Sequence, residues 1–223
     1  MKVAFEYDKE KDVWCLLNRG KSSNNSQLPT KVYERLVTSC GENPTPEATA
    51  TFIDEYIADN GIDVQQYITK YQEDWDTVAD EYQKRAEAIF GVFLPNDVKG
   101  YLTVNNRCPY SIDKDYFFVS MPTSSARRTT MHELWHFYTW YGLGTTQEEK
   151  LGKQKYNDLK EALTVLLNVE CRDLMPEGMH DDGYPQHKEL REKILQFWAQ
   201  DRDINKLWTS LAFHYFMYIK ISD

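Results

Sequence analysis

The sequence predicts an α+β fold on the strength of two observations. Runs rich in β-branched and aromatic residues, which are typical of strands, lie before residue 122. After residue 124 the apolar residues recur every three or four positions, which is typical of helices. Strands followed by helices, rather than alternating with them, indicate an α+β protein. The length of 223 residues suits a single domain over 1–223, with an N-terminal lobe at 1–122 and a helical lobe at 123–223.

Composition narrows the class of protein further. Lys and Arg number 26 against 35 Asp and Glu, a net charge of −9. This acidity argues against nucleic-acid and anionic-membrane partners, because both need a basic surface. No stretch approaches the roughly 20 apolar residues of a membrane span, and charges interrupt the N-terminal segment where a signal peptide needs an apolar run. Four widely spaced cysteines are typical of free thiols in a reducing compartment, so we expect a cytoplasmic protein.

The first expected element is a β-hairpin. Residues 3–7 and 13–17 are apolar runs that flank a polar turn. A short helix follows, because Thr45 is a favourable N-cap, Pro46 suits the first helical position and Gly61 ends the pattern.

The middle of the chain combines one long helix with two strands. Apolar and aromatic residues recur at spacings of three and four over residues 63–90, which predicts a single amphipathic helix. Strands are expected at 100–104 and 116–121. The remaining elements are helices, predicted at 125–141, 147–171, 187–200 and 204–219.

One of these helices carries residues that point to metal chemistry. It contains His132-Glu133-Leu134-Trp135-His136, two histidines four positions apart with a glutamate after the first. Residues i and i+4 lie one turn apart on the same helix face, so both imidazoles can reach one metal ion. Glu133 flanks that face, where it can take a proton from a water molecule. The competing interpretation is two core histidines that share a helix face.

The motif and its surroundings resemble the zincin metallopeptidases over about residues 98–190. The strand at 116–121 followed by the helix at 125–141 is similar to their edge strand and active-site helix. The glycine and histidine that extend the motif in the metzincin branch are absent, since Thr139 and Gly142 stand there. The resemblance implies a zincin-like fold in which the strand 116–121 pairs with an extended peptide.

The gluzincin branch is the better match. Its third metal ligand is a glutamate on the following helix, and Lys160-Glu161-Ala162 resembles the segment that supplies it. Glu161 follows His136 by 25 residues, with glycines between them. The resemblance therefore implies a Zn²⁺ cofactor held by His132, His136 and Glu161, with one open position for water.

One departure from the family pattern and one alternative ligand remain. Thermolysin-like gluzincins place an aspartate four residues after the ligand glutamate, where it orients a zinc-binding imidazole, but Val165 occupies that position. Either another group supplies this orientation or the site binds metal less tightly. Glu161 also shares a polar stripe of its helix, as a solvated residue would, and Glu170 is the alternative ligand.

A second patch, at residues 181–187, is a candidate for binding the oxyanion that forms when water attacks a peptide carbonyl. Thermolysin-like enzymes use a histidine there, oriented by an aspartate five residues earlier. Asp182 and His187 have that spacing, and Tyr184 is a further donor. The competing interpretations are an exposed His187 without a role, or His180 in its place.

These observations predict a zinc metallopeptidase. Glu133 acts as general base in the hydrolysis of peptide bonds, and the partner is a peptide or protein substrate. The alternative is a zincin-fold protein that regulates or binds a partner with little or no peptidase activity.

Overall fold

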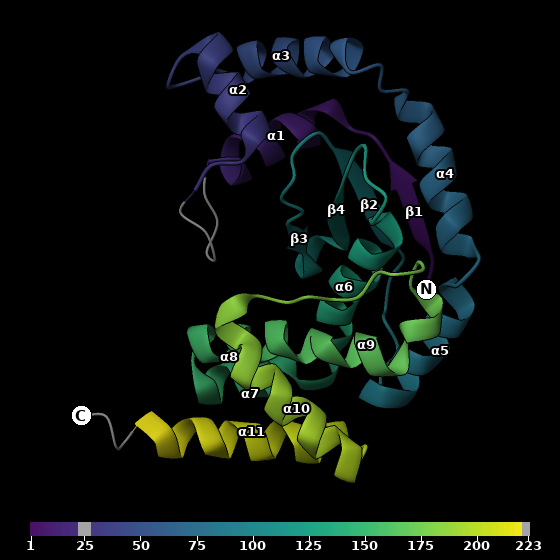
Figure 1. Ribbon diagram of the computed structural model, residues 1–223, viewed down its shortest axis with the longest axis vertical. Helices are drawn as coiled ribbons and strands as arrows, with labels where there is room; N and C mark the ends of the chain where they lie inside the picture. Colours follow the sequence, from purple (N-terminus) through teal and green to yellow (C-terminus); the bar gives the residue numbers. More distant parts are fainter. Residues whose placement is uncertain (22–27, 220–223) are drawn as a thin grey trace. The chain divides into compact units, whose positions relative to one another are not determined.

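The computed structural model describes residues 1–21 and 28–219 and shows two compact units (Figure 1). The first unit comprises Met1–Thr77 and Asn96–Thr130, and the second comprises Val78–Pro95 and Met131–Asp223. The predicted α+β class is confirmed. The expected boundary at residue 122 assigns residues 78–95 to the first lobe, whereas the structure groups them with the second unit. Within the described residues, no helix has the length and apolar character that crossing a membrane requires.

The first unit is built on a four-stranded sheet with the order β1-β2-β4-β3. Its strands are β1 (Val3–Glu6), β2 (Val98–Thr103), β3 (Tyr110–Ser111) and β4 (Tyr116–Ser120). β1, β2 and β4 run parallel, and β3 pairs with β4 in the antiparallel direction. The strands expected at 100–104 and 116–121 are confirmed to within two residues.

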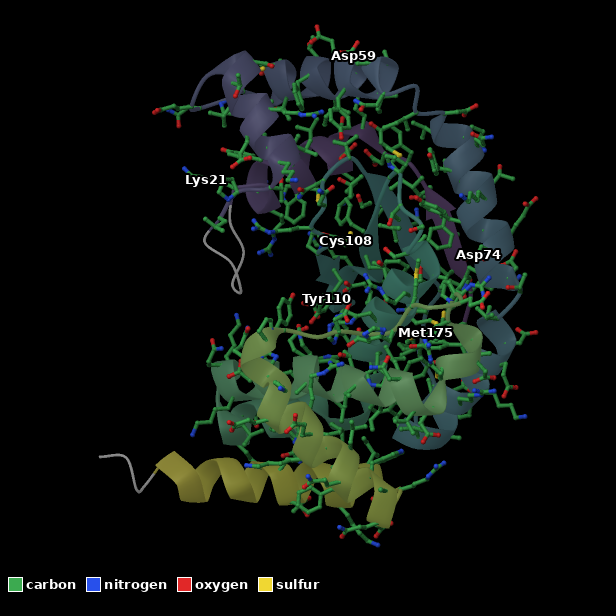
Figure 2. The ribbon with its side chains drawn as sticks, in the orientation of Figure 1. Lys21, Asp59, Asp74, Cys108, Tyr110 and Met175 are labelled. Carbon is green, nitrogen blue, oxygen red and sulfur yellow. The ribbon has the colours of Figure 1, made fainter. Side chains whose placement is uncertain are left out.

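β4 lies inside the sheet, so the expectation that the strand 116–121 forms its edge is wrong. Phe117 pairs with Tyr110 of β3, and the Phe118 N–H donates to the Pro109 carbonyl at 2.9 Å. Figure 2 labels Tyr110, on the short strand that covers this side. The chain between β2 and β4 folds back on itself, and β3 thereby occupies the hydrogen-bonding groups at the start of β4 that an added peptide needs.

The predicted hairpin is also wrong, because residues 13–17 belong to a helix, α1 (Lys9–Arg19). Asp8, in the expected turn, is its N-cap. The Asp8 carboxylate accepts hydrogen bonds from the backbone N–H groups of Glu10 and Lys11. A short apolar run does not by itself distinguish a buried strand from a buried helix, and the capping aspartate favours the helix.

Three further helices belong to the first unit: α2 (Lys31–Cys40), α3 (Pro46–Asp59) and α4 (Val64–Asp76). α2 was not predicted from the sequence. The predicted cap of α3 is confirmed, since the Thr45 hydroxyl accepts from the Ala48 N–H. α4 runs beside β1 (Figure 1). Its Gln72 side chain accepts from the Phe5 N–H and donates to the Val3 carbonyl, which fixes the helix to the strand.

The long helix predicted over residues 63–90 is two helices. α4 ends at Asp76, and α5 (Ala79–Phe90) begins after a break at Thr77 and Val78. Val78 leaves the helical region with φ −127°, and the Thr77 hydroxyl bonds back to the Asp74 carbonyl. Two adjacent β-branched residues favour such a break, and the two units meet in the chain at this point.

The second unit is helical. After α5 it contains α6 (Ala126–Thr139, which starts in the first unit), a π-helical turn η2 (Trp140–Gly144), α7 (Thr145–Leu151), α8 (Lys153–Leu163), a 3₁₀ turn η3 (Thr164–Leu166), α9 (Leu167–Glu170), α10 (Lys188–Gln200) and α11 (Ile204–Ile219). The predicted helix 147–171 is interrupted at Gly152, whose φ of +77° lies in the left-handed region. The helices predicted near 187–200 and 204–219 are confirmed. α10 packs on α8, the helix that carries Glu161.

Candidate metal centre

The two motif histidines lie one turn apart on α6, with their rings edge to face. Nε2 of His132 is 3.0 Å from Nε2 of His136. The rest of the helix is set in the core: Trp135 is fully buried, and the Tyr82 hydroxyl of α5 donates to the Met131 carbonyl at 2.7 Å. Both motif histidines belong to the second unit.

Glu161, on α8, completes the cluster. Its Oε2 atom lies 3.7 Å from Nε2 of His132 and 3.5 Å from Nε2 of His136. All three ligand atoms are within 4.8 Å of one another. Zinc with bonds of about 2.0–2.1 Å in tetrahedral geometry separates its ligand atoms by about 3.3 Å, so the donor set and its spacing fit this metal.

The charges in the cluster suit a divalent cation. Burial raises the pKa of Glu161, but His136 and hydrogen bonds to both histidines outweigh burial and hold the pKa well below its usual range. Burial lowers the pKa of His136 to about 4. Burial also lowers the pKa of His132, but the hydrogen bonds to Asp181 and Glu161 outweigh burial and raise this pKa to about 10.

Glu133 lies beside the cluster without belonging to it. It is 7% exposed, and its Oε2 atom is buried with no hydrogen-bond partner among the described residues. Burial, with a contribution from Glu161 and against the opposing effect of His132, raises the pKa of Glu133 to about 8. An unsatisfied buried carboxyl is costly, and one next to metal ligands is suited to exchanging protons.

Asp181 contacts the histidine cluster and was not singled out from the sequence. It lies in the segment between α9 and α10, with its Oδ2 atom 2.6 Å from Nδ1 of His132. Its Oδ1 atom accepts from the Thr164 hydroxyl at 2.8 Å and from Nη1 of Arg191 at 2.9 Å. Burial opposes ionisation, but the His132 bond and these donors hold the pKa of Asp181 well below its usual range. Asp181 thus holds Nδ1 of His132 by a hydrogen bond, which the apolar side chain of Val165 could not do.

The backbone around Asp181 is fixed as firmly as its side chain. Asn168 accepts from the Asp181 N–H at 2.7 Å and donates to the Asp181 carbonyl at 2.8 Å. Gly183, with φ +65°, permits the approach of Arg191, because a Cβ atom there would lie 2.4 Å from Nη1. The sequence shows two adjacent aspartates, Asp181 and Asp182, before Gly183. The five-residue spacing to His187 favoured Asp182 over Asp181 as the functional one.

The structure also separates the two candidate third ligands. Oε1 of Glu170 accepts from Nε1 of Trp198 at 2.7 Å, and Arg202 lies 3.3 Å from the same oxygen. Glu170 thus ties α9 to α10 and the segment after it, and it is not in the histidine cluster.

The predicted pairing of Asp182 with His187 is not observed. His187 is buried, at 3% exposure, and its Nε2 atom lies 3.2 Å from Oδ1 of Asp158 on α8. Asp182 is exposed and pairs with His180 at 2.7 Å. The Tyr184 ring meets the His187 ring edge to face with centroids 5.8 Å apart. His187 therefore pairs with Asp158, three positions before Glu161, and not with Asp182.

Comparisons with protein-family models, with curated proteins and with solved structures found no match. The assignment of this site therefore depends on its own residues. Two imidazoles and a carboxylate converge, a buried carboxyl lies beside them, and Asp181 orients one imidazole from behind.

Proposed function

We propose that this protein is a zinc-dependent hydrolase of peptide bonds. The observation that carries the proposal is the convergence of His132, His136 and Glu161, whose ligand atoms all lie within 4.8 Å of one another. The hydrogen bond from His132 to Asp181 supports it, because a zinc-binding imidazole commonly donates its second ring nitrogen to a carboxylate. We infer that Nδ1 of His132 carries the donated proton and that Nε2 binds the metal.

In the proposed reaction each side chain has a different task. When bound, zinc acts as a Lewis acid that activates water and polarises the carbonyl. Glu133, with a buried oxygen that no described group satisfies, accepts the proton of the attacking water and transfers it to the leaving amine. Tyr184 and His187 are the proposed donors to the oxyanion, with Asp158 holding His187.

Two measurements on purified protein test this function. Elemental analysis of wild type and of His132→Ala, purified without added metal, determines whether zinc is bound and whether the motif binds it. Digestion of casein, an unstructured protein, is then followed with and without a chelator. We expect about one zinc per chain in wild type, little in His132→Ala, and hydrolysis that the chelator abolishes.

The Glu133→Gln variant separates chemistry from binding. Its amide cannot accept the proton, so we expect zinc content to be kept and hydrolysis to fall by several orders of magnitude. Turnover retained in zinc-loaded Glu133→Gln would contradict the mechanism. Zinc bound by wild type without hydrolysis of any peptide would instead favour a regulatory or partner-binding role.

A further inference from the structure

Lys160 is an unusual lysine. It lies on α8 next to Glu161 and is only 6% exposed, although lysines are almost never fully buried unless they are paired. Its Nζ atom is 3.2 Å from Oε1 of Glu161. Lys160 belongs to the segment Lys160-Glu161-Ala162 that resembles the third-ligand segment of the gluzincins, and the proposed reaction assigns it no role.

The two oxygens of Glu161 have different partners. Oε2 faces the imidazoles of His132 and His136, at 3.7 and 3.5 Å. Oε1 faces the Lys160 ammonium. Carboxylates can bind metals through one oxygen or through both, so whatever holds Oε1 decides how many oxygens Glu161 offers.

The same pattern recurs at the other carboxylate that contacts a histidine of the cluster. Oδ2 of Asp181 faces His132, whereas Oδ1 faces the guanidinium of Arg191. Each of these two acids therefore has one oxygen toward the cluster and one toward its own buried cation. A charged donor makes a stronger and better-oriented hydrogen bond than a neutral one, which is why a cation suits this task.

We propose that Lys160 is a positioning residue that retains Oε1 of Glu161 and so presents Oε2 alone to the metal. This inference rests on the proposed zinc site. Its consequence is that Glu161 contributes a single ligand atom, which keeps the number of protein ligands at three, as in catalytic rather than closed structural sites.

The test uses Co²⁺ in place of zinc in the full-length protein. Cobalt absorbs visible light, and the absorption weakens when a fifth ligand joins a tetrahedral set, so the spectrum reports coordination without any need for activity. Four proteins are compared: wild type, Lys160→Met, Lys160→Arg and Lys153→Met. Lys153 is an exposed lysine at the start of the same helix, so its variant carries the same change of charge far from Oε1.

We expect wild type and Lys153→Met to give the same intense spectrum. Lys160→Met should lose intensity, because Oε1 is released and joins the metal, and Lys160→Arg should recover it by restoring a charged donor. An unchanged spectrum in Lys160→Met would overturn the inference, whatever happens to affinity. If Lys160→Met does not fold, a weakened spectrum in Lys160→Arg, which keeps the charge, would overturn it instead.

Failure of the underlying site would look different. Wild type that takes up neither Co²⁺ nor Zn²⁺ would overturn the proposed function and this inference together. Metal uptake that depends on His132 and Glu161, combined with identical spectra in all four proteins, would overturn only the role of Lys160.

Discussion

Oδ2 of Asp181 lies 2.6 Å from Nδ1 of His132, although 49 positions separate the two residues in the chain. The contact joins the segment before α10 to the helix that carries the motif. It fixes which ring nitrogen of His132 faces Glu161. The orientation of the imidazole therefore depends on a residue that no pattern local to the motif identifies.

The first prediction concerns this contact. Asp181→Asn replaces the buried anion by a neutral amide of the same shape, so the His132 proton loses its charged acceptor. Zinc affinity should fall by about 10- to 100-fold, the usual cost of losing an outer hydrogen-bond partner of a ligand. Competition with a chromophoric chelator measures the affinity. Asp182→Asn removes the same charge from the neighbouring exposed residue, and an equal loss in that variant would argue against a specific role for Asp181.

The second prediction distinguishes the two candidate third ligands by thermal unfolding. Zinc that binds the folded state raises the melting temperature by mass action. Glu161→Ala should remove most of that increment. Glu170→Ala should lower the melting temperature of the metal-free protein, since Trp198 and Arg202 lose their acceptor, and yet keep the increment. Zinc stabilisation that is lost in Glu170→Ala and kept in Glu161→Ala would reverse the assignment.

The third prediction uses two glycines with left-handed φ angles in the same segment. Alanine at either position lowers the free energy of unfolding by about 1–2 kcal/mol, because its Cβ atom disfavours a left-handed φ. At Gly178 (φ +76°) a Cβ atom meets nothing within 4 Å, whereas at Gly183 (φ +65°) it would collide with the Arg191 guanidinium. Gly183→Ala should therefore unfold at lower denaturant concentration than Gly178→Ala. It should also bind zinc more weakly, because Arg191 no longer reaches Asp181. Equal stability and zinc affinity in the two variants would show that Arg191 tolerates the displacement.

The fourth prediction concerns pH and lies in the first unit. Asp12 on α1 is fully buried and accepts hydrogen bonds from the Thr103 hydroxyl and the Val104 N–H. Burial raises the pKa of Asp12 to about 6, against the opposing effect of these bonds. The folded state thus holds this proton more tightly than the unfolded state, whose carboxyl titrates near 4. Stability should fall as pH rises from about 4 to 6 and then level off.

The Asp12→Asn variant isolates this effect, because an amide oxygen can accept the same two hydrogen bonds without titrating. Relative to the variant, wild type should lose up to about 3 kcal/mol of unfolding free energy between pH 4 and 6, since each pKa unit is worth about 1.4 kcal/mol. Urea denaturation at several pH values measures the difference. A constant difference across this range would contradict the prediction.

Local signals in the sequence were sufficient where one residue decides an element. Thr45 and Pro46 predicted the start of α3, and the spacing of the two histidines predicted their shared face. Local signals were insufficient where one residue is compatible with two kinds of element. Asp8 suits a turn as well as a helix N-cap. The sequence therefore predicted a turn at Asp8 and a strand at residues 13–17, where the structure has α1. The periodicity of residues 63–90 continues through Thr77 and Val78, so the break there was invisible.

The site divides in the same way. His132, Glu133 and His136 belong to one helical turn, and the spacing of residues on a helix reveals them. Glu161 could be assigned only through the family resemblance. Packing decides which acidic residue of a later helix faces the two histidines, and the sequence does not show this. Asp181 and Lys160 could not be found at all: their roles depend on contacts with His132 and Glu161 that only the folded chain makes.

The chain crosses from one unit to the other three times, after Thr77, Pro95 and Thr130. The second unit is therefore not a continuous stretch of sequence, although the residues of the candidate site all lie after residue 131. A fragment cut at that point would lack α5, whose Phe90 ring packs against Trp135 with centroids 5.0 Å apart. A segment that contains the whole second unit must therefore begin before α5 and also include residues 96–130 of the first unit.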